Sequence, residues 1–166
     1  MDTRTALMTR RSIRVYTDEA VAEEDLRSIV EAGIHAPYGR NQIWRFALVI
    51  DTELINKLAE LTIYKKFVST AKALIVVFYD QELVYHDMKD AQTMGACIQN
   101  MLLAAHDMGL GAVWIGEILK NEDKVRELCG APDNFRLSAV LSLGRPAKDG
   151  VYEERDSPER VIFFKK

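Results

Sequence analysis

The segment over residues 88–108 has the most regular pattern of apolar positions in the chain. Its apolar residues recur at steps of three and four, which predicts a long helix that ends at Gly109 and Gly111. Asp2 or Thr3 can cap a short first helix that runs to about Arg10. Similar spacing predicts a helix that begins in the acidic run 19–25 and ends at Pro37, and helices over residues 52–61 and 122–128.

Four segments have the apolar patterns that are typical of strands. The run from Ala73 to Tyr79 is apolar throughout, as expected of a buried central strand, and strands are also predicted over residues 45–50, 112–115 and 137–143. One very long helix and short loops do not fit a repeated β-α-β pattern. We therefore expect an α+β sandwich with a mixed sheet.

The polar tail from Ala147 onward ends in an apolar stretch, Arg160 to Phe164. An apolar end on a polar tail is unusual for a free terminus. It predicts a terminal strand that docks onto another surface, and a partner subunit is one candidate for that surface.

Composition narrows the class of protein. The 166 residues contain no internal repeat or linker, so residues 1–166 are treated as one domain. A net charge of −3 gives no electrostatic reason to expect nucleic acid or an anionic membrane as a partner. The apolar runs are too short to span a bilayer, and the charged N-terminus does not resemble a secretory signal.

The two cysteines and three histidines suggest no reactive or metal-binding site. Cys97 and Cys129 form neither a metal-binding pair nor a disulfide framework, so we expect buried or half-buried thiols and a cytoplasmic location. The histidines stand singly at unrelated spacings, and no metal site is predicted.

A basic segment follows the first helix. Arg10, Arg11, Ser12 and Arg14 place three cations and a hydroxyl within five residues, a group that could bind a phosphate. A solvated basic turn would have the same composition. The segment alone does not decide between the two.

A second cluster lies between the second predicted helix and the first strand. Pro37, Tyr38 and Gly39 order a loop in which Asn41 and Gln42 offer amide donors and acceptors to a planar heterocycle. An ordinary helix-to-strand turn is the alternative interpretation. Trp44 is expected to anchor the strand in the core rather than to stack on a ligand.

Two further clusters lie toward the C-terminus. Gly116 directly follows a predicted strand, where a missing side chain lets a flat ligand approach the backbone. The glycines at 109 and 111 do not form a dinucleotide fingerprint, because they precede the strand and open no helix. Gly144-Arg145-Pro146 ends the last strand, and Arg155 lies in the charged tail.

Taken in order, these clusters resemble the nitroreductase family of flavoproteins over nearly the whole chain. The resemblance runs from Arg-Arg-Ser-Ile-Arg, through the Ala-Pro loop that ends in Trp-Arg-Phe, to Gly-Leu-Gly, Trp-Ile-Gly and Gly-Arg-Pro. It implies an α/β/α sandwich with a mainly antiparallel sheet. It also implies a homodimer in which long helices pack at the interface, terminal segments wrap the neighbour, and noncovalent FMN binds between the subunits.

The resemblance also implies roles for individual residues. Arg10, Ser12 and Arg155 would bind the FMN phosphate with help from Arg11, and Arg14 would lie near the pyrimidine edge. The loop residues would reach the flavin of the other subunit, and backbone groups after the third strand would lie beside flavin N5. The implied cofactor-binding residues are Arg10, Arg11, Ser12, Arg14, Pro37, Tyr38, Gly39, Asn41, Gln42, Ile115, Gly116, Glu117 and Arg155.

The sequence departs from the family pattern at two places. Asn41-Gln42-Ile43-Trp44 is one residue shorter than the usual motif and lacks its proline, so the roles of the two amides stay open. The chain also lacks room for the insertion that covers the active site in larger members. The segment from Tyr64 to Phe67 could line the substrate side instead.

The resemblance implies a ping-pong reaction, in which NADH or NADPH delivers hydride to the flavin and an electron-poor nitroaromatic or quinone is then reduced. No side chain is required as an acid or base, so no catalytic residue is assigned. Two alternatives stay open. One is a flavin-binding or sensing module without turnover, and the other is a family branch with different flavin chemistry.

Overall fold

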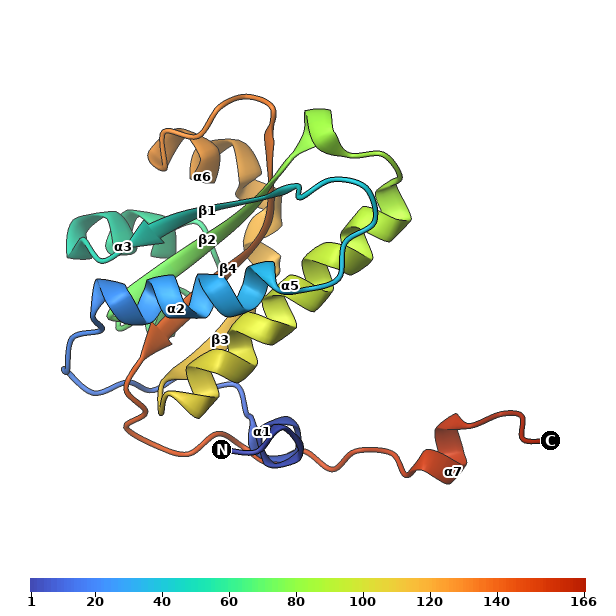
Figure 1. The fold of residues 1–166 in the computed structure, drawn as a ribbon. Coiled ribbons are helices and arrows are strands. Elements are labelled where there is room, and N and C mark those ends of the chain that lie inside the picture. Colours follow the sequence, from blue (N-terminus) through green and yellow to red (C-terminus); the bar gives the residue numbers. More distant parts are fainter.

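A four-stranded antiparallel sheet with the order β1-β2-β4-β3 forms the centre of the computed structural model, which describes residues 1–166 (Figure 1). The strands are β1 (Trp44–Val49), β2 (Ala73–Asp80), β3 (Gly111–Ile115) and β4 (Phe135–Gly144). The predicted strands therefore lie where the apolar patterns placed them. The sheet is not mixed, because the one parallel pairing is an isolated bridge between Ser12 and Ala112.

Helices cover both faces of the sheet and give the α/β/α sandwich. Alternate residues of β2 face opposite layers, and this is why its sequence is apolar throughout. Ile75 and Val77 pack in the layer of α2 (Glu23–Ile34) and α5 (Asp87–Asp107). Val76 and Phe78 pack in the opposite layer. That layer contains α3 (Thr52–Ala59), α4 (Lys65–Val68), the 3-10 helix η2 (Glu117–Asn121) and α6 (Glu122–Leu128).

The long helix α5 ends as the sequence predicted. Gly109 has φ of 73°, a left-handed conformation that glycine adopts without strain. Its N–H donates to the carbonyl of His106 at 3.0 Å, and the Leu110 N–H donates to that of Ala105 at 2.8 Å. This pair of bonds is the Schellman motif, which reverses the chain directly into β3.

The N-terminal helix and the first part of the C-terminal tail lie close to the end of α5 and to β3 (Figure 1). Helix α1 (Thr3–Thr9) begins at Asp2, whose carboxylate accepts a hydrogen bond from the Thr5 N–H at 3.1 Å. The tail after β4 first crosses the segment that follows α1 and then extends away from the body of the molecule (Figure 1). The remaining short element near the sheet is the 3-10 helix η1 (Gln81–Leu83).

The predicted terminal strand over residues 160–164 is wrong at its start, where Arg160 and Val161 are helical, whereas Ile162 is extended and docking onto a partner subunit stays a prediction. Pro158 occupies the first turn of a short helix, α7 (Pro158–Val161), a position where its fixed φ favours helix and its missing N–H is not needed. Phe163 is fully exposed and Phe164 is 69% exposed, so the apolar end packs on nothing in its own chain. None of the helices is long and apolar enough to cross a bilayer.

Candidate functional site

The basic segment after α1 runs along the outer edge of β3. The Arg10 N–H ends α1 by donating to the Ala6 carbonyl at 3.0 Å. Two residues later Ser12 bridges to Ala112, and the Ile13 N–H donates to the Ala112 carbonyl at 3.1 Å. The backbone of the segment is therefore fixed to the edge of the sheet.

Arg10, Arg11 and Arg155 lie together at this edge, and neither Arg10 nor Arg11 forms an ion pair with a carboxylate. Arg10 is half-buried, and its pKa is lowered first by burial and then by the positive charges of Arg11 and Arg155. The Arg11 guanidinium donates only to the main-chain carbonyls of Met8 and Arg10, at 2.9 and 2.7 Å. A group of cations that repel one another is stabilised by a bound anion, and guanidinium matches the geometry of a phosphate.

The tail brings Arg155 into this group. Gly150 lies so close to Arg11 that a Cβ at this position would overlap the Arg11 side chain. Two residues later the Tyr152 ring lies under the Arg11 guanidinium, 4.8 Å from its carbon. Arg155 follows in the chain and lies near enough to Arg10 for its positive charge to lower the Arg10 pKa. Its own ion pair with Glu153 is exposed and 3.6 Å long.

The far end of β3 offers open backbone. Ile115 is buried, and a Cβ added to Gly116 would meet nothing nearer than the Trp114 Nε1 at 4.0 Å. The Glu117 side chain turns back toward the protein, where it accepts hydrogen bonds from the Thr62 hydroxyl and the Ile63 N–H and pairs with Lys120. Only the backbone around Gly116 is left for a flat ligand.

The segment from Tyr64 to Phe67 lies beside this strand end. The Arg14 guanidinium carbon lies 6.0 Å from the centre of the Phe67 ring, and the Tyr64 and Phe67 rings lie 5.4 Å apart. Asn121 fixes the preceding turn by donating to the Leu61 carbonyl at 2.6 Å. The segment from Tyr64 to Phe67 therefore lies beside Arg14 and the end of β3, and its role on the substrate side stays a prediction.

The loop over residues 37–42 is not part of this group in the same chain. It leads into β1, the strand at the opposite edge of the sheet from β3 (Figure 1). The Tyr38 ring packs edge-on against Trp44 at 5.7 Å, and Gly39 lies directly against the Tyr85 ring. The Asn41 amide donates to the Leu83 carbonyl at 2.7 Å, whereas Gln42 is exposed.

The positions of these predicted residues in the fold fall into two sets. Arg10, Arg11, Ser12, Arg14, Ile115, Gly116, Glu117 and Arg155 gather along β3, while Pro37, Tyr38, Gly39, Asn41 and Gln42 lie at the other edge. Trp44 is buried in the core, as predicted. No group of three or more His, Cys, Asp or Glu side chains could hold a metal ion.

Residues 7–89 and 59–145 match the sequence profile of the Nitroreductase family. The chain belongs to the nitroreductase family. An Archaeoglobus fulgidus relative, provisionally named NADH dehydrogenase/NAD(P)H nitroreductase, is 37% identical over 93% of each chain. The NADPH-flavin oxidoreductase of Vibrio harveyi is 30% identical over 94% of this chain and 70% of its own.

Solved structures of the family have the same fold. A Desulfovibrio desulfuricans protein, provisionally named a nitroreductase and crystallised in complex with FMN, is 40% identical. It superposes with a TM-score of 0.92 over 100% of this chain and 99% of its own. The NADPH:FMN oxidoreductase of Vibrio harveyi, solved with NAD+, is 28% identical and superposes with a TM-score of 0.87, covering 99% of this chain and 77% of its own.

Sequence reasoning missed the contacts that hold the site together. Gly150 in an otherwise polar tail was a signal of close backbone approach, and the aromatic Tyr152 two residues later completes the contact with Arg11. Thr62 gave no such signal, because its partner Glu117 lies 55 residues further along the chain.

Proposed function

We propose that this chain is an NAD(P)H-dependent FMN oxidoreductase. The proposal rests on the group of Arg10, Arg11 and Arg155, in which Arg10 and Arg11 have no carboxylate partner. This group lies at one end of an exposed strand edge that leads to the open backbone of Gly116. An anion-binding end and a flat, unobstructed end are what a flavin mononucleotide requires. The FMN-bound relative with the same fold supports this assignment.

The residues present fit FMN in the order in which they occur along β3. Arg10, Ser12 and Arg155 would bind the phosphate, and Arg11 would support them through its backbone. Arg14 would lie at the pyrimidine edge, with the backbone of residues 115–117 beside the reactive part of the ring. When bound, FMN supplies two-electron chemistry. NADH or NADPH would deliver hydride first, and an electron-poor acceptor such as a nitroaromatic or a quinone would be reduced after the nucleotide has left.

The chain's own contribution to the reaction is position and electrostatics. The Arg14 guanidinium is a fixed positive charge that favours extra negative charge at the ring edge beside it. Glu117 is held in contacts with Thr62, Ile63 and Lys120, so its side chain is occupied in structure rather than offered to a substrate. No side chain is assigned as a proton donor or acceptor.

A homodimer would complete the site. The loop with Pro37, Tyr38, Gly39, Asn41 and Gln42 lies too far around the sheet to meet Arg10 of its own chain, and a second copy could present it there. The exposed apolar end, Val161 to Phe164, would gain cover from the same partner. Mixing Arg10→Ala protomers with Gly39→Trp protomers should then restore activity, because each mixed dimer has one intact site. Failure of denatured and co-refolded mixtures to regain activity would contradict the shared site.

The domain organisation and the two cysteines bear on where the protein works. Residues 1–166 are proposed to form a single FMN-binding domain. Both cysteines are free, and burial raises the pKa of the Cys97 thiol to about 12 and that of Cys129 to about 11. Unreactive free thiols fit a reducing compartment, so we propose the cytoplasm.

Anaerobic addition of NADH or NADPH to the purified protein tests the function. Bound flavin should give a visible band near roughly 450 nm that bleaches with at least one nucleotide. A colourless protein that does not take up FMN would contradict the assignment of the β3 edge. A yellow protein that neither nucleotide reduces would instead favour a flavin-binding or sensing module.

A further inference from the structure

The tail is held loosely after it leaves the sheet. The Ala147 N–H donates to the Val15 carbonyl at 2.9 Å, and no residue after Ala147 forms a hydrogen bond with the chain before the tail. A cleft of about 310 Å³ lies between the tail and the end of α5, with His106 and Asp149 among the residues that line it. The course of the tail over the basic segment therefore depends on a small number of side-chain contacts.

Two of these contacts are made with Arg11. Gly150 lies against the Arg11 Cβ, and a Cβ at Gly150 would lie 3.2 Å from the Ser12 carbonyl oxygen. The centre of the Tyr152 ring lies 4.8 Å from the Arg11 guanidinium carbon, a distance typical of a cation–π contact. Tyr152 is therefore the last residue before Arg155 whose side chain holds the tail to the basic segment.

Arg11 is a fixed platform for that ring. Its guanidinium donates to the carbonyls of Met8 and Arg10, at 2.9 and 2.7 Å. Both carbonyls lie at the end of α1, where no later turn supplies an N–H and the helix dipole favours a cation. The flat face of the guanidinium is therefore held in place, and a ring stacked on it is held with it.

The contact at Tyr152 limits how far Arg155 can move. Arg155 lies three residues after Tyr152, and three residues extend over at most about 10–11 Å. The positive charge of Arg155 reaches Arg10, whose pKa it lowers. The ion pair of Arg155 with Glu153 does not fix this position, because an exposed pair 3.6 Å long contributes little.

We propose that Tyr152 is a positioning residue for the cofactor phosphate. Its ring, stacked on Arg11, keeps the tail across the basic segment, so that Arg155 meets the same phosphate as Arg10 and Ser12. This role rests on the proposed FMN function, and it involves no contact between Tyr152 and the flavin ring.

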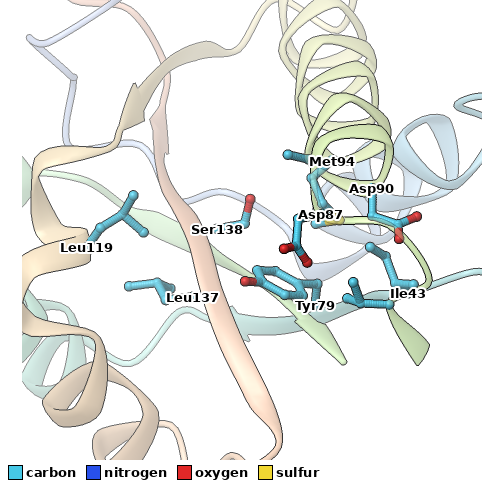
Figure 2. A pocket seen from close by; sticks show the side chains of 10 residues that line it. Ile43, Tyr79, Asp87, Asp90, Met94, Leu119, Leu137 and Ser138 are labelled. Atoms are coloured by element: carbon cyan, nitrogen blue, oxygen red, sulfur yellow. The ribbon is translucent and has the colours of Figure 1, made fainter. Parts of the chain in front are cut away.

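The effect of Tyr152 should be confined to the phosphate end of the site. The flavin ring is proposed to lie at the other end of β3, beside residues 115–117. Near that end lies a cavity of about 350 Å³ that Leu119, Ser138 and Tyr79 border (Figure 2). No residue of the tail or of the basic segment lines this cavity. A change at Tyr152 should therefore alter phosphate binding and leave the surroundings of the ring intact.

Fluorescence titrations of the flavin-free protein with FMN and with riboflavin test this role, because riboflavin lacks the phosphate. Tyr152→Leu keeps an apolar side chain but loses the aromatic face, and Tyr152 is 68% exposed, so the core is undisturbed. FMN affinity should fall about two- to fivefold, the effect of losing one exposed cation–π contact, while riboflavin affinity stays the same. Tyr152→Phe keeps the ring and should retain the wild-type FMN affinity. Val151→Ala, at an exposed neighbouring position of the tail, is the matched control and should change neither affinity.

Two further measurements examine the same contact without riboflavin. At one phosphate concentration, inorganic phosphate should raise the melting temperature of the flavin-free wild type and of Tyr152→Phe by the same amount, and that of Tyr152→Leu by less. In an Arg11→Leu background, Tyr152→Leu should have no further effect on FMN affinity, because both substitutions remove one and the same contact.

Equal losses of FMN and riboflavin affinity in Tyr152→Leu would overturn the proposal, because a general structural role, or a contact with a partner subunit, would affect both flavins. Unchanged FMN affinity in Tyr152→Leu, a phosphate response equal to that of the wild type, or additive effects of the Arg11 and Tyr152 substitutions would each overturn it as well. Failure of the proposed function would be recognised separately, since a wild-type protein that takes up neither flavin contradicts the FMN assignment itself.

Discussion

The Glu117 carboxylate and the Thr62 hydroxyl join the end of β3 to the turn before α4, with 2.7 Å between Oε2 and Oγ1. The same oxygen accepts the Ile63 N–H at 3.1 Å, and the buried Thr62 hydroxyl accepts the N–H of Tyr64 at 3.2 Å. The strand end and the aromatic segment on the proposed substrate side are therefore held in a fixed relation.

Replacement of Glu117 by alanine should loosen this relation without removing the flavin. We expect KM for the acceptor to rise about five- to tenfold with a smaller change in kcat, because positioning of the acceptor is lost rather than the reactive group. Glu117→Gln keeps an oxygen that accepts from Thr62, so it should recover most of the lost affinity. Steady-state kinetics with one nitroaromatic acceptor would measure this. An equal effect of the two substitutions would show that charge, not the hydrogen bonds to the turn, is what matters.

The same contact should be insensitive to pH across the neutral range. The hydrogen bond from Lys120, followed by that from Thr62, lowers the pKa of Glu117 below its ordinary value of 4.5. Because the pKa of Glu117 is lower in the folded protein, the contact is fully formed at pH values above 4.5. It is lost as the pH falls through the pKa that Glu117 has in the folded protein. KM for the acceptor should therefore be flat from about pH 5 to 8 as far as Glu117 is concerned. In Lys120→Ala the acidic decline of acceptor affinity should move to higher pH.

Arg10 and Arg155 should each contribute to phosphate binding. A charge-assisted hydrogen bond lost from a phosphate corresponds to about a 10- to 100-fold weaker affinity for FMN in Arg10→Ala or Arg155→Ala. Inorganic phosphate should also raise the melting temperature of the flavin-free protein, because an anion relieves the repulsion that lowers the Arg10 pKa. Arg4→Ala, in an exposed position of α1, is the matched control and should retain FMN. Unaltered FMN affinity in Arg10→Ala would remove this segment from the site.

The contrast between Gly109 and Thr62 shows what a sequence can predict. The end of α5 depends on glycine a few residues from the last apolar turn, so local pattern was enough to place it. The contact of Thr62 with Glu117 joins segments that only the fold brings together. Motif order predicted one shared site for Arg10, Ser12 and Gly116, and their flavin contacts stay a prediction. That they lie along β3, and that the loop at Gly39 lies at the other edge of the sheet, required the strand order.

The terminal segment shows a different limit. The apolar run at Val161 to Phe164 correctly indicated a segment that its own chain does not cover, but the predicted strand began too early, because Arg160 and Val161 belong to α7. Apolar composition indicates a need for burial, whereas Pro158 favours the helical turn that precedes the extended end.

Gly116 and Gly111 should respond differently to alanine. A Cβ at Gly116 meets open space, and its φ of −96° suits any residue, so Gly116→Ala should keep its stability and lose affinity for FMN. A Cβ at Gly111 would lie 2.6 Å from the Ile13 side chain, so Gly111→Ala should lower stability by about 1–3 kcal/mol through overpacking. Thermal melts and FMN titrations on both variants separate the two effects. Gly95→Ala, a helix position with no neighbour within 4 Å, should leave FMN binding intact. Full FMN affinity in Gly116→Ala would show that the ring does not approach this backbone.

Tyr16 should make the fold sensitive to alkaline pH. Its buried hydroxyl donates to the Ile13 carbonyl at 2.8 Å and lies 2.7 Å from the Ser142 hydroxyl, which is itself fully buried. Tyr16→Phe leaves that serine without its partner and should cost about 1–3 kcal/mol at neutral pH, as measured by urea unfolding. Tyr152→Phe, at an exposed tyrosine, is the control and should leave stability unchanged.

Burial raises the pKa of Tyr16 from 10.0 to about 12. A folded pKa above the unfolded one gives stability that is fully present below about pH 10 and is lost as pH rises toward the folded value, since the unfolded chain ionises first. The two-unit difference corresponds to about 2–3 kcal/mol over that interval. The buried thiols of Cys97 and Cys129 add to the same decline, but they are present in both proteins. Urea unfolding at about pH 8 and pH 11 should therefore show a shallower loss of stability in Tyr16→Phe than in the wild type. Parallel losses in the two proteins would show that the Tyr16 hydroxyl ionises as readily in the folded state as in the unfolded chain.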